Sequence, residues 1–114
     1  MDRIESTAFT SDSGWQVAVE FEGWKVAYLG YNARFSKLEE MERHLKTDEV
    51  FVLLQGSATL YVEDLYEEMV QGKVYNVRAG QWHHIVVSED AAVLVVENSS
   101  TSRDNTEKRS VSPC

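Results

Sequence analysis

The sequence predicts a single all-β domain, built as a sandwich or barrel of about eight short strands. The chain has 114 residues, which is the size of one domain. Its composition, 43% hydrophobic with one proline, is that of a globular protein with a buried core. Short runs rich in Val, Tyr, Phe and Leu are separated by turn residues about every ten positions, as is typical of β-strands. Any functional site must therefore lie within one small β-domain.

The apolar runs give the expected strands in order along the chain. The first two, residues 15–21 and 24–31, form a hairpin joined at Glu22-Gly23. The central strands are expected at 50–54 and 58–62, and the later ones at 66–70, 73–77, 82–87 and 92–97. Gly-containing or polar breaks at 55–57, 71–72, 79–80 and 88–90 separate them.

The segment between residues 37 and 46 has a different pattern. Leu38, Met41 and Leu45 fall at helical spacing, which taken alone predicts a short helix. The assignment matters because His44 lies in this segment.

The two ends of the chain differ from the middle. Residues 99–114 are almost entirely polar, with Val111 as their one sizeable aliphatic side chain, so we expect a loosely attached, flexible tail. Residues 1–12 are expected to form an N-terminal extension. The β-barrel domain is then expected to span residues 13–98.

Charge and cysteine content exclude several classes of function. The chain has 11 Lys and Arg residues against 19 Asp and Glu, a net charge of −8, which disfavours nucleic acid as a partner. We find no apolar run of membrane-spanning length and no apolar leader at the start, so we expect a soluble cytoplasmic protein without a membrane partner. The single cysteine, Cys114, allows no intrachain disulfide and no cysteine-rich zinc site.

The candidate site depends on few residues, because the chain has only three histidines, His44, His83 and His84. A transition metal held without cysteine needs imidazole and carboxylate ligands that converge from rigid positions. His44 is followed by Glu49 at the start of an expected strand, and His83 follows the turn at 79–81 at the start of another. His44, Glu49 and His83 are therefore candidate ligands.

At these residues the sequence resembles the cupin superfamily. The latter part of the first cupin motif matches His44, four residues, Glu49, six residues and Gly56. The second motif matches Gly72, five residues, Arg78-Ala79-Gly80, two residues and His83. The resemblance covers residues 40–97 and implies a single-domain jelly-roll β-barrel with at most one short helix. It also implies one divalent metal ion (zinc, iron, manganese or nickel) held by His44, Glu49 and His83.

The sequence departs from the cupin motifs at three positions. Glu42 stands where the first histidine of His-x-His is expected, Arg78 where a proline is expected and Val87 where an asparagine is expected. In a strand, Glu42 shares a face with His44, so it is either a substitute metal ligand or a solvated surface charge. The cupin pattern also favours a strand or loop entry over 42–49, with a turn of helix at 36–41.

His84 cannot share the site with His83, because neighbouring residues of a strand point to opposite faces. We assign His83 to the interior, since Ile85 and Val87 share its face, and we expect Trp82 and His84 to point outward. A metal-free reading stays open, in which His44 and Glu49 form a hydrogen-bonded pair that closes the barrel.

Two classes of function follow. One is an enzyme in which the metal activates a small carboxylate, enolate or polyhydroxy compound, by isomerase, lyase or oxygenase chemistry. Arg34, Arg43 or Lys46 would orient this ligand where they face inward. The other is a non-catalytic module that binds or senses a small molecule. The resemblance further implies a homodimer, for which Trp15 and Trp24 of the hairpin offer an apolar contact.

Overall fold

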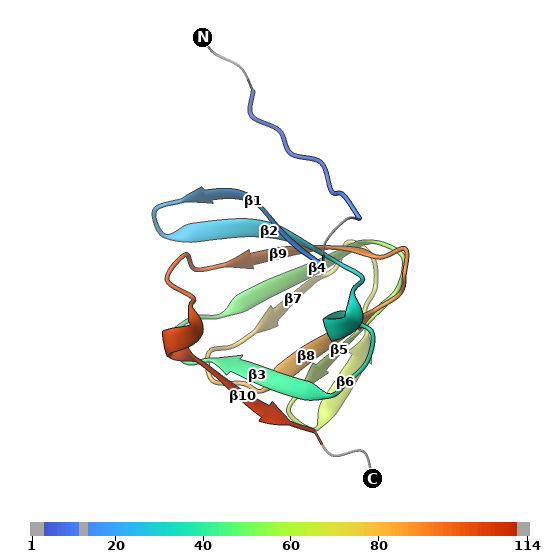
Figure 1. The fold of residues 1–114 in the computed structure, drawn as a ribbon, viewed down its shortest axis with the longest axis vertical. Coiled ribbons are helices and arrows are strands. Elements are labelled where there is room, and N and C mark those ends of the chain that lie inside the picture. The colour runs from blue at the N-terminus through green and yellow to red at the C-terminus, as the bar shows by residue number, and fades with distance from the viewer. Residues whose placement is uncertain (1–3, 12–13, 112–114) are drawn as a thin grey trace.

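A computed structural model describes residues 4–11 and 14–111 and shows an all-β fold of two five-stranded antiparallel sheets that face each other (Figure 1). The first sheet has the strand order β1-β2-β9-β4-β7, and the second has the order β10-β3-β8-β5-β6. The strands are β1 (Trp15–Phe21), β2 (Trp24–Gly30), β3 (Glu40–His44), β4 (Glu49–Gln55), β5 (Ala58–Val62), β6 (Leu65–Glu68), β7 (Val74–Val77), β8 (His83–Val87), β9 (Ala92–Glu97) and β10 (Thr106–Ser110). Two short 3-10 helices complete it, η1 (Ala33–Phe35) and η2 (Arg103–Asn105). The all-β prediction is confirmed.

The core lies between the sheets and is built from alternate residues of the central strands. Phe51 and Leu53 of β4 and Val93 and Val95 of β9 are almost fully buried. Because strand side chains alternate in direction, Glu49 and Glu97 share the faces of these core residues and point inward at the strand ends. The core pattern therefore carries two carboxylates to one end of the sandwich.

The segment around His44 is a strand and not a helix. Residues 40–44 form β3, which pairs with β10 over five residues, from Thr106 opposite His44 to Ser110 opposite Glu40. The helical turn occurs earlier than expected, as η1 at residues 33–35 instead of 36–41. Backbone pairing with β10 decides the conformation here, and the spacing of Leu38, Met41 and Leu45 does not reveal it.

The expectation of a loose tail after residue 98 is wrong for residues 103–110. This part of the chain forms η2 and then β10, the edge strand of the second sheet (Figure 1). Its side chains are mostly polar because an edge strand can remain exposed while its backbone pairs with a neighbour. Cys114 lies outside the described residues.

The turn at Gly56 is a position that only glycine fits. Gly56 has φ +75°, and an added Cβ would lie 2.7 Å from Ala91 Cα. The cupin-like spacing from Glu49 to Gly56 therefore corresponds to β4 followed by the tight turn into β5.

The described part of the N-terminal extension, residues 4–11, lies along the first hairpin. The Tyr28 hydroxyl donates to the Thr7 carbonyl, and Gln16 Nε2 donates to the Ala8 carbonyl. Among the described residues, no helix is long and apolar enough to cross a membrane.

Candidate metal centre

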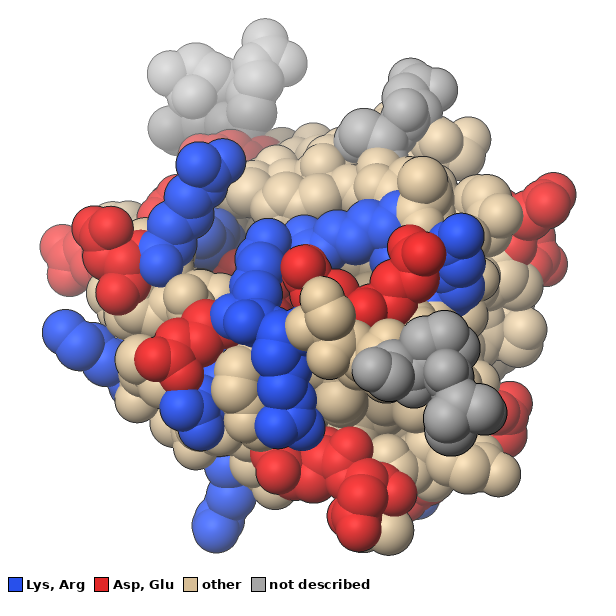
Figure 2. Space-filling view, turned by 60° about the horizontal axis from the view of Figure 1, so that its bottom comes forward, with Lys and Arg blue, Asp and Glu red and all other residues tan. Residues whose placement is uncertain are grey.

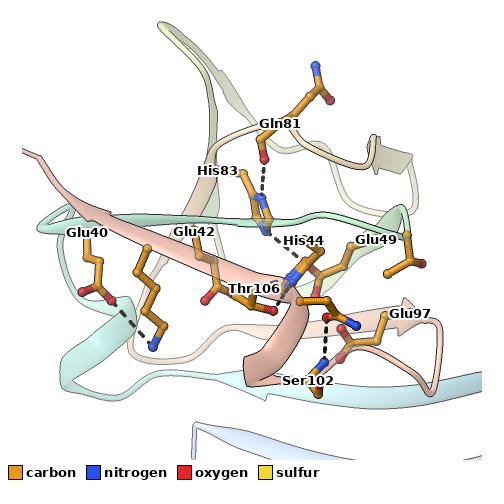
Figure 3. A network of polar contacts seen from close by, with 12 residues as sticks. Glu40, Glu42, His44, Glu49, Gln81, His83, Glu97, Ser102 and Thr106 are labelled. Atoms are coloured by element: carbon orange, nitrogen blue, oxygen red, sulfur yellow. Dashed lines mark hydrogen bonds and ion pairs between the residues drawn. The ribbon is translucent and has the colours of Figure 1, made fainter.

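The three predicted ligands meet between the sheets, although they come from three strands. Glu49 begins β4 in the first sheet, while His44 ends β3 and His83 begins β8 in the second. The Nε2 atoms of His44 and His83 each lie 3.0 Å from the same atom, Glu49 Oε1. Figure 3 shows the three side chains close together, and all three are buried. The structure thus brings together the residues that the two sequence motifs placed at separate strand ends.

The outer nitrogen of each imidazole is held by a second hydrogen bond. His83 Nδ1 lies 3.1 Å from the Gln81 carbonyl oxygen, and His44 Nδ1 lies 2.9 Å from Thr106 Oγ1 (Figure 3). A carbonyl only accepts, so His83 Nδ1 carries a proton and donates it. In a neutral His83 ring, the Nε2 lone pair then faces a carboxylate oxygen. Such a contact requires a cation between the two atoms, either a proton or a metal ion.

Glu49 is a stable carboxylate in this position. Burial acts to raise its pKa, but the hydrogen bonds from His44 and His83 and the charges of these rings outweigh burial and lower the pKa to about 2. At His44, burial acts to lower the pKa, whereas the hydrogen bond to Glu49 and the nearby carboxylates produce a net rise. The cluster therefore favours positive charge beside Glu49.

Glu42 faces the cluster from β3. Its carboxylate lies 3.6 Å from His44 Nε2 and 2.8 Å from Arg34 Nη2, and its side chain is 18% exposed. It also lies directly opposite His83 in the β3–β8 pair. The sequence left Glu42 either as a substitute metal ligand or as a solvated surface charge. Its position beside the cluster disagrees with a solvated surface charge.

Glu97 is a site residue that the sequence reasoning missed. It ends β9, lies opposite Glu49 on one side and Lys25 on the other, and is 7% exposed. Burial, and next the charge of Glu49, raise the pKa of Glu97 to about 7, although Lys25 Nζ lies 3.8 Å away. The sequence did hold one signal for Glu97: side chains alternate between the two faces of a strand, so Glu97 shares a face with Val93 and Val95.

Two overlapping sets of three donors could hold a metal ion, and each set contains two of the three predicted ligands. The atoms of Glu42, His44 and His83 lie within 4.8 Å of one another, as do those of His44, Glu49 and Glu97. Imidazole nitrogen and carboxylate oxygen are ligands of zinc, iron, manganese and nickel. The 3.0 Å separations around Glu49 Oε1 are hydrogen-bond distances, and they are close to the roughly 3 Å between neighbouring ligands of an octahedral ion with bonds of about 2.1 Å.

His84 lies apart from Glu49 and is covered by its own chain. It is buried, its Nε2 lies 3.0 Å from the Lys37 carbonyl, and its ring stacks on Phe35 with centroids 6.0 Å apart. Burial lowers its pKa. His84 is therefore not exposed at the surface, as an outward-pointing residue would be, because η1 and the loop after it cover its ring.

A cavity of about 750 Å³ opens over the cluster. Leu29, Phe51 and Ile85 provide apolar lining, and the cluster provides the polar part. Of the three cations proposed to orient a ligand, Arg34 lines the cavity and Lys46 does not, whereas Arg43 stacks on Trp82 and pairs with Glu107. The cavity can therefore receive a small molecule directly beside the candidate metal ligands.

Comparison with solved structures identifies the fold. Pac13 from Streptomyces, described as a nucleoside dehydratase, has a TM-score of 0.67 at 12% identity, covering 94% of this chain and 85% of that one. A cupin-2 domain protein from Shewanella frigidimarina has a TM-score of 0.62 at 20% identity, covering 79% and 84%. An RmlC-like cupin from Methanocaldococcus jannaschii, with a double-stranded β-helix fold, has a TM-score of 0.62 at 16% identity, covering 85% and 93%. No family model and no curated protein sequence matches the chain. The chain has the cupin fold.

Proposed function

We propose that the protein binds one divalent metal ion through His44, Glu49 and His83 and uses the cavity above it to bind a small, oxygen-rich anionic molecule. The observation that carries this proposal is the convergence of two imidazole Nε2 atoms on one carboxylate oxygen, each at 3.0 Å. The hydrogen bonds at Nδ1 fix both rings in the orientation that metal-bound histidines usually have.

The charge around the cluster also favours a divalent ion. Glu42, Glu49 and Glu97 crowd around two imidazoles, and the raised pKa of Glu97 reflects that crowding. Lys25 and Arg34 neutralise part of the negative charge from outside the cluster. A metal ion among these groups would relieve the remaining repulsion.

A bound divalent ion would polarise a carbonyl, hydroxyl or carboxylate oxygen of the ligand. The protein's own residues would do the rest: the apolar lining excludes water, Arg34 attracts negative charge, and Glu97 offers a carboxyl group able to accept a proton. These parts suit isomerase or lyase chemistry, or oxygenase chemistry with iron. The Pac13 structures with uridine show that a protein of this fold accepts an oxygen-rich sugar derivative.

A non-catalytic, metal-free binding module is the alternative function. The observation in its favour is that protonated His44 and His83 would satisfy Glu49 by hydrogen bonds alone, without any metal. In this alternative, the cavity binds a small molecule, but no metal ion is present to act as a Lewis acid.

Proton exchange in D₂O tests the enzyme against the binding module. Metal-loaded protein is incubated with small 2-hydroxy and 2-oxo acids, and exchange of the carbon-bound hydrogens is followed by NMR. The enzyme reading predicts exchange that is lost in Glu97→Gln protein with its metal retained. Binding without exchange in the wild type would contradict isomerase and lyase chemistry and favour the module.

We also propose a homodimer. The outer face of the first sheet is apolar, with Val26, Val96 and Val50 in one cross-strand row and Tyr28, Leu94, Val52 and Val74 in the next. Strands with apolar residues on both faces are typical of sheets that are covered on both sides. Phe21 and Trp24 at the hairpin end are 60% and 45% exposed, which adds to this apolar surface.

A further inference from the structure

The cavity has a wall that lies outside the cupin motifs and, from residue 99 onward, outside the predicted domain. We call residues 98–105 the strap: it leaves β9, crosses the open end of the sandwich as η2 and enters β10 (Figure 1). The Ser99 hydroxyl bonds to the Glu22 carbonyl, and the Leu45 amide donates to the Asn105 carbonyl at 2.8 Å. The strap is therefore fixed to the first hairpin at one end and to the residue after β3 at the other.

Both ends of the strap adjoin the candidate metal centre. Glu97 precedes it, and Thr106, whose Oγ1 lies 2.9 Å from His44 Nδ1, follows it (Figure 3). Between them, Thr101, Ser102 and Arg103 line the cavity. The strap thus faces the same space as the proposed metal ligands.

The strap contributes a cation, Arg103, that has no counterion among the described residues. Four cations line the cavity, namely Lys25, Arg34, Arg103 and Lys108. The first two pair with the site residues Glu97 and Glu42, and Lys108 lies 3.9 Å from Glu40. Within residues 4–11 and 14–111, no ion pair involves Arg103, which is exposed at the mouth.

The net charge of the lining favours an anion. The four cations face three carboxylates, Glu42, Glu49 and Glu97, so a divalent ion would give the lining a charge of about +3 if all three were ionised. On the side where β3 and β10 come forward, Lys and Arg side chains gather among the acidic ones despite the net charge of −8 (Figure 2). An anionic ligand is therefore attracted to the mouth of the cavity.

We infer that Arg103 binds the carboxylate of a small dicarboxylate whose other end lies at the metal centre. This inference rests on the proposed function and names its ligand class. A guanidinium fork matches the two oxygens of one carboxylate and binds it through two charge-assisted hydrogen bonds. Arg103 begins η2, and Thr106, which contacts His44, directly follows this single short turn, so the base of the arginine lies close along the chain to the metal centre. The ligand that joins the two ends is therefore short.

Calorimetric titration of zinc-loaded protein with succinate and with acetate tests this inference. Wild-type protein is expected to bind succinate more tightly than acetate. Arg103→Ala should weaken succinate binding about tenfold or more, the usual effect of losing a hydrogen bond between charged groups, and leave acetate unchanged. Arg103→Lys should be intermediate, because it keeps the charge but loses the fork.

Arg109→Ala is the matched control, because Arg109 stacks on Trp82 and does not line the cavity. Zinc content and thermal unfolding are measured for every variant. Wild-type protein that binds no zinc would overturn both the proposed function and this inference. Protein that binds zinc but prefers no dicarboxylate, or keeps its succinate affinity in Arg103→Ala, would overturn this inference alone.

Discussion

Glu49 connects the two histidines of the site, because a single oxygen of its side chain lies 3.0 Å from both Nε2 atoms. It comes from one sheet and the histidines come from the other, so the cluster also joins the two layers. Removing either imidazole leaves a buried carboxylate with half of its partners. At the residue scale, the three side chains therefore act as one unit.

Alanine variants test which histidines hold the metal. His44→Ala and His83→Ala should each abolish stoichiometric metal binding, because each removes one of only two nitrogen donors. His84→Ala should keep it, since His84 bonds to the Lys37 carbonyl and stacks on Phe35. Metal analysis after equilibrium dialysis measures the outcome, with circular dichroism to confirm folding. Metal loss in His84→Ala together with retention in His83→Ala would show that the assignment is wrong.

Glu42 is tested by removing its charge while keeping its size. Glu42→Gln should lower metal affinity by about tenfold or more, the range expected when a group at or next to a metal is changed. Glu40→Gln is the control on the same strand, because Glu40 is exposed and pairs only distantly with Lys108. Competition with a fluorescent chelator gives both affinities. Equal affinities in the two variants would make Glu42 a bystander.

Sequence spacing was enough to find the residues of the central cluster but not those around it. His44, Glu49 and His83 follow motif spacing, because each stands at the start or end of a strand. Glu97 belongs to no motif: side-chain alternation places it on the inner face of β9, but only the pairing of β9 with β4 places it opposite Glu49. Such cross-strand neighbours depend on the pairing register of the strands, which the local sequence does not determine.

At the element scale, β10 and the strap give the C-terminal segment a defined structure. The residues of β10, Thr-Glu-Lys-Arg-Ser, contain no apolar periodicity, and their strand forms because their backbone pairs with β3. Composition could not predict this, since charged residues are also what protects an exposed sheet edge. Removal of residues 99–114 should expose the edge of β3 and loosen His44, whereas a loosely attached tail could be removed without effect.

A single hydroxyl group tests the contribution of β10 to the site. Thr106→Val keeps the shape but removes the bond to His44 Nδ1, so it should cost about 1 kcal/mol in the free energy of unfolding and about tenfold in metal affinity. Thr101→Val is the matched control, because the Thr101 hydroxyl is buried and has no hydrogen-bond partner in the part of the chain that the structure describes. Urea unfolding and metal titration compare the two. The same losses in both variants would contradict a specific role for Thr106.

At the scale of the whole molecule, the apolar outer face of the first sheet predicts association. Sedimentation at micromolar concentration should show a dimer, and Trp24→Ser should shift it toward monomer, because Trp24 is 45% exposed at the hairpin end. Tyr66→Ser, which changes an even more exposed aromatic residue on β6 of the other sheet, should leave the dimer intact. A concentration-independent monomer would contradict the proposal.

The cupin fold was predictable because its strands are short, apolar and separated by clear turns. The hairpin and β5 lie almost where the sequence places them, and Gly56 closes its turn with a backbone conformation that favours glycine. The polar connections were less predictable, since η1, the strap and β10 owe their structure to hydrogen bonds with distant segments.

The metal content of protein purified without chelator tests the central claim most directly. Elemental analysis should find one equivalent of a divalent transition metal per wild-type chain, and almost none in His44→Ala protein prepared in parallel. Wild-type protein that carries no more metal than His44→Ala, even after incubation with zinc, iron, manganese or nickel, would contradict the account. The cluster around Glu49 would then be a hydrogen-bonded closure of the barrel.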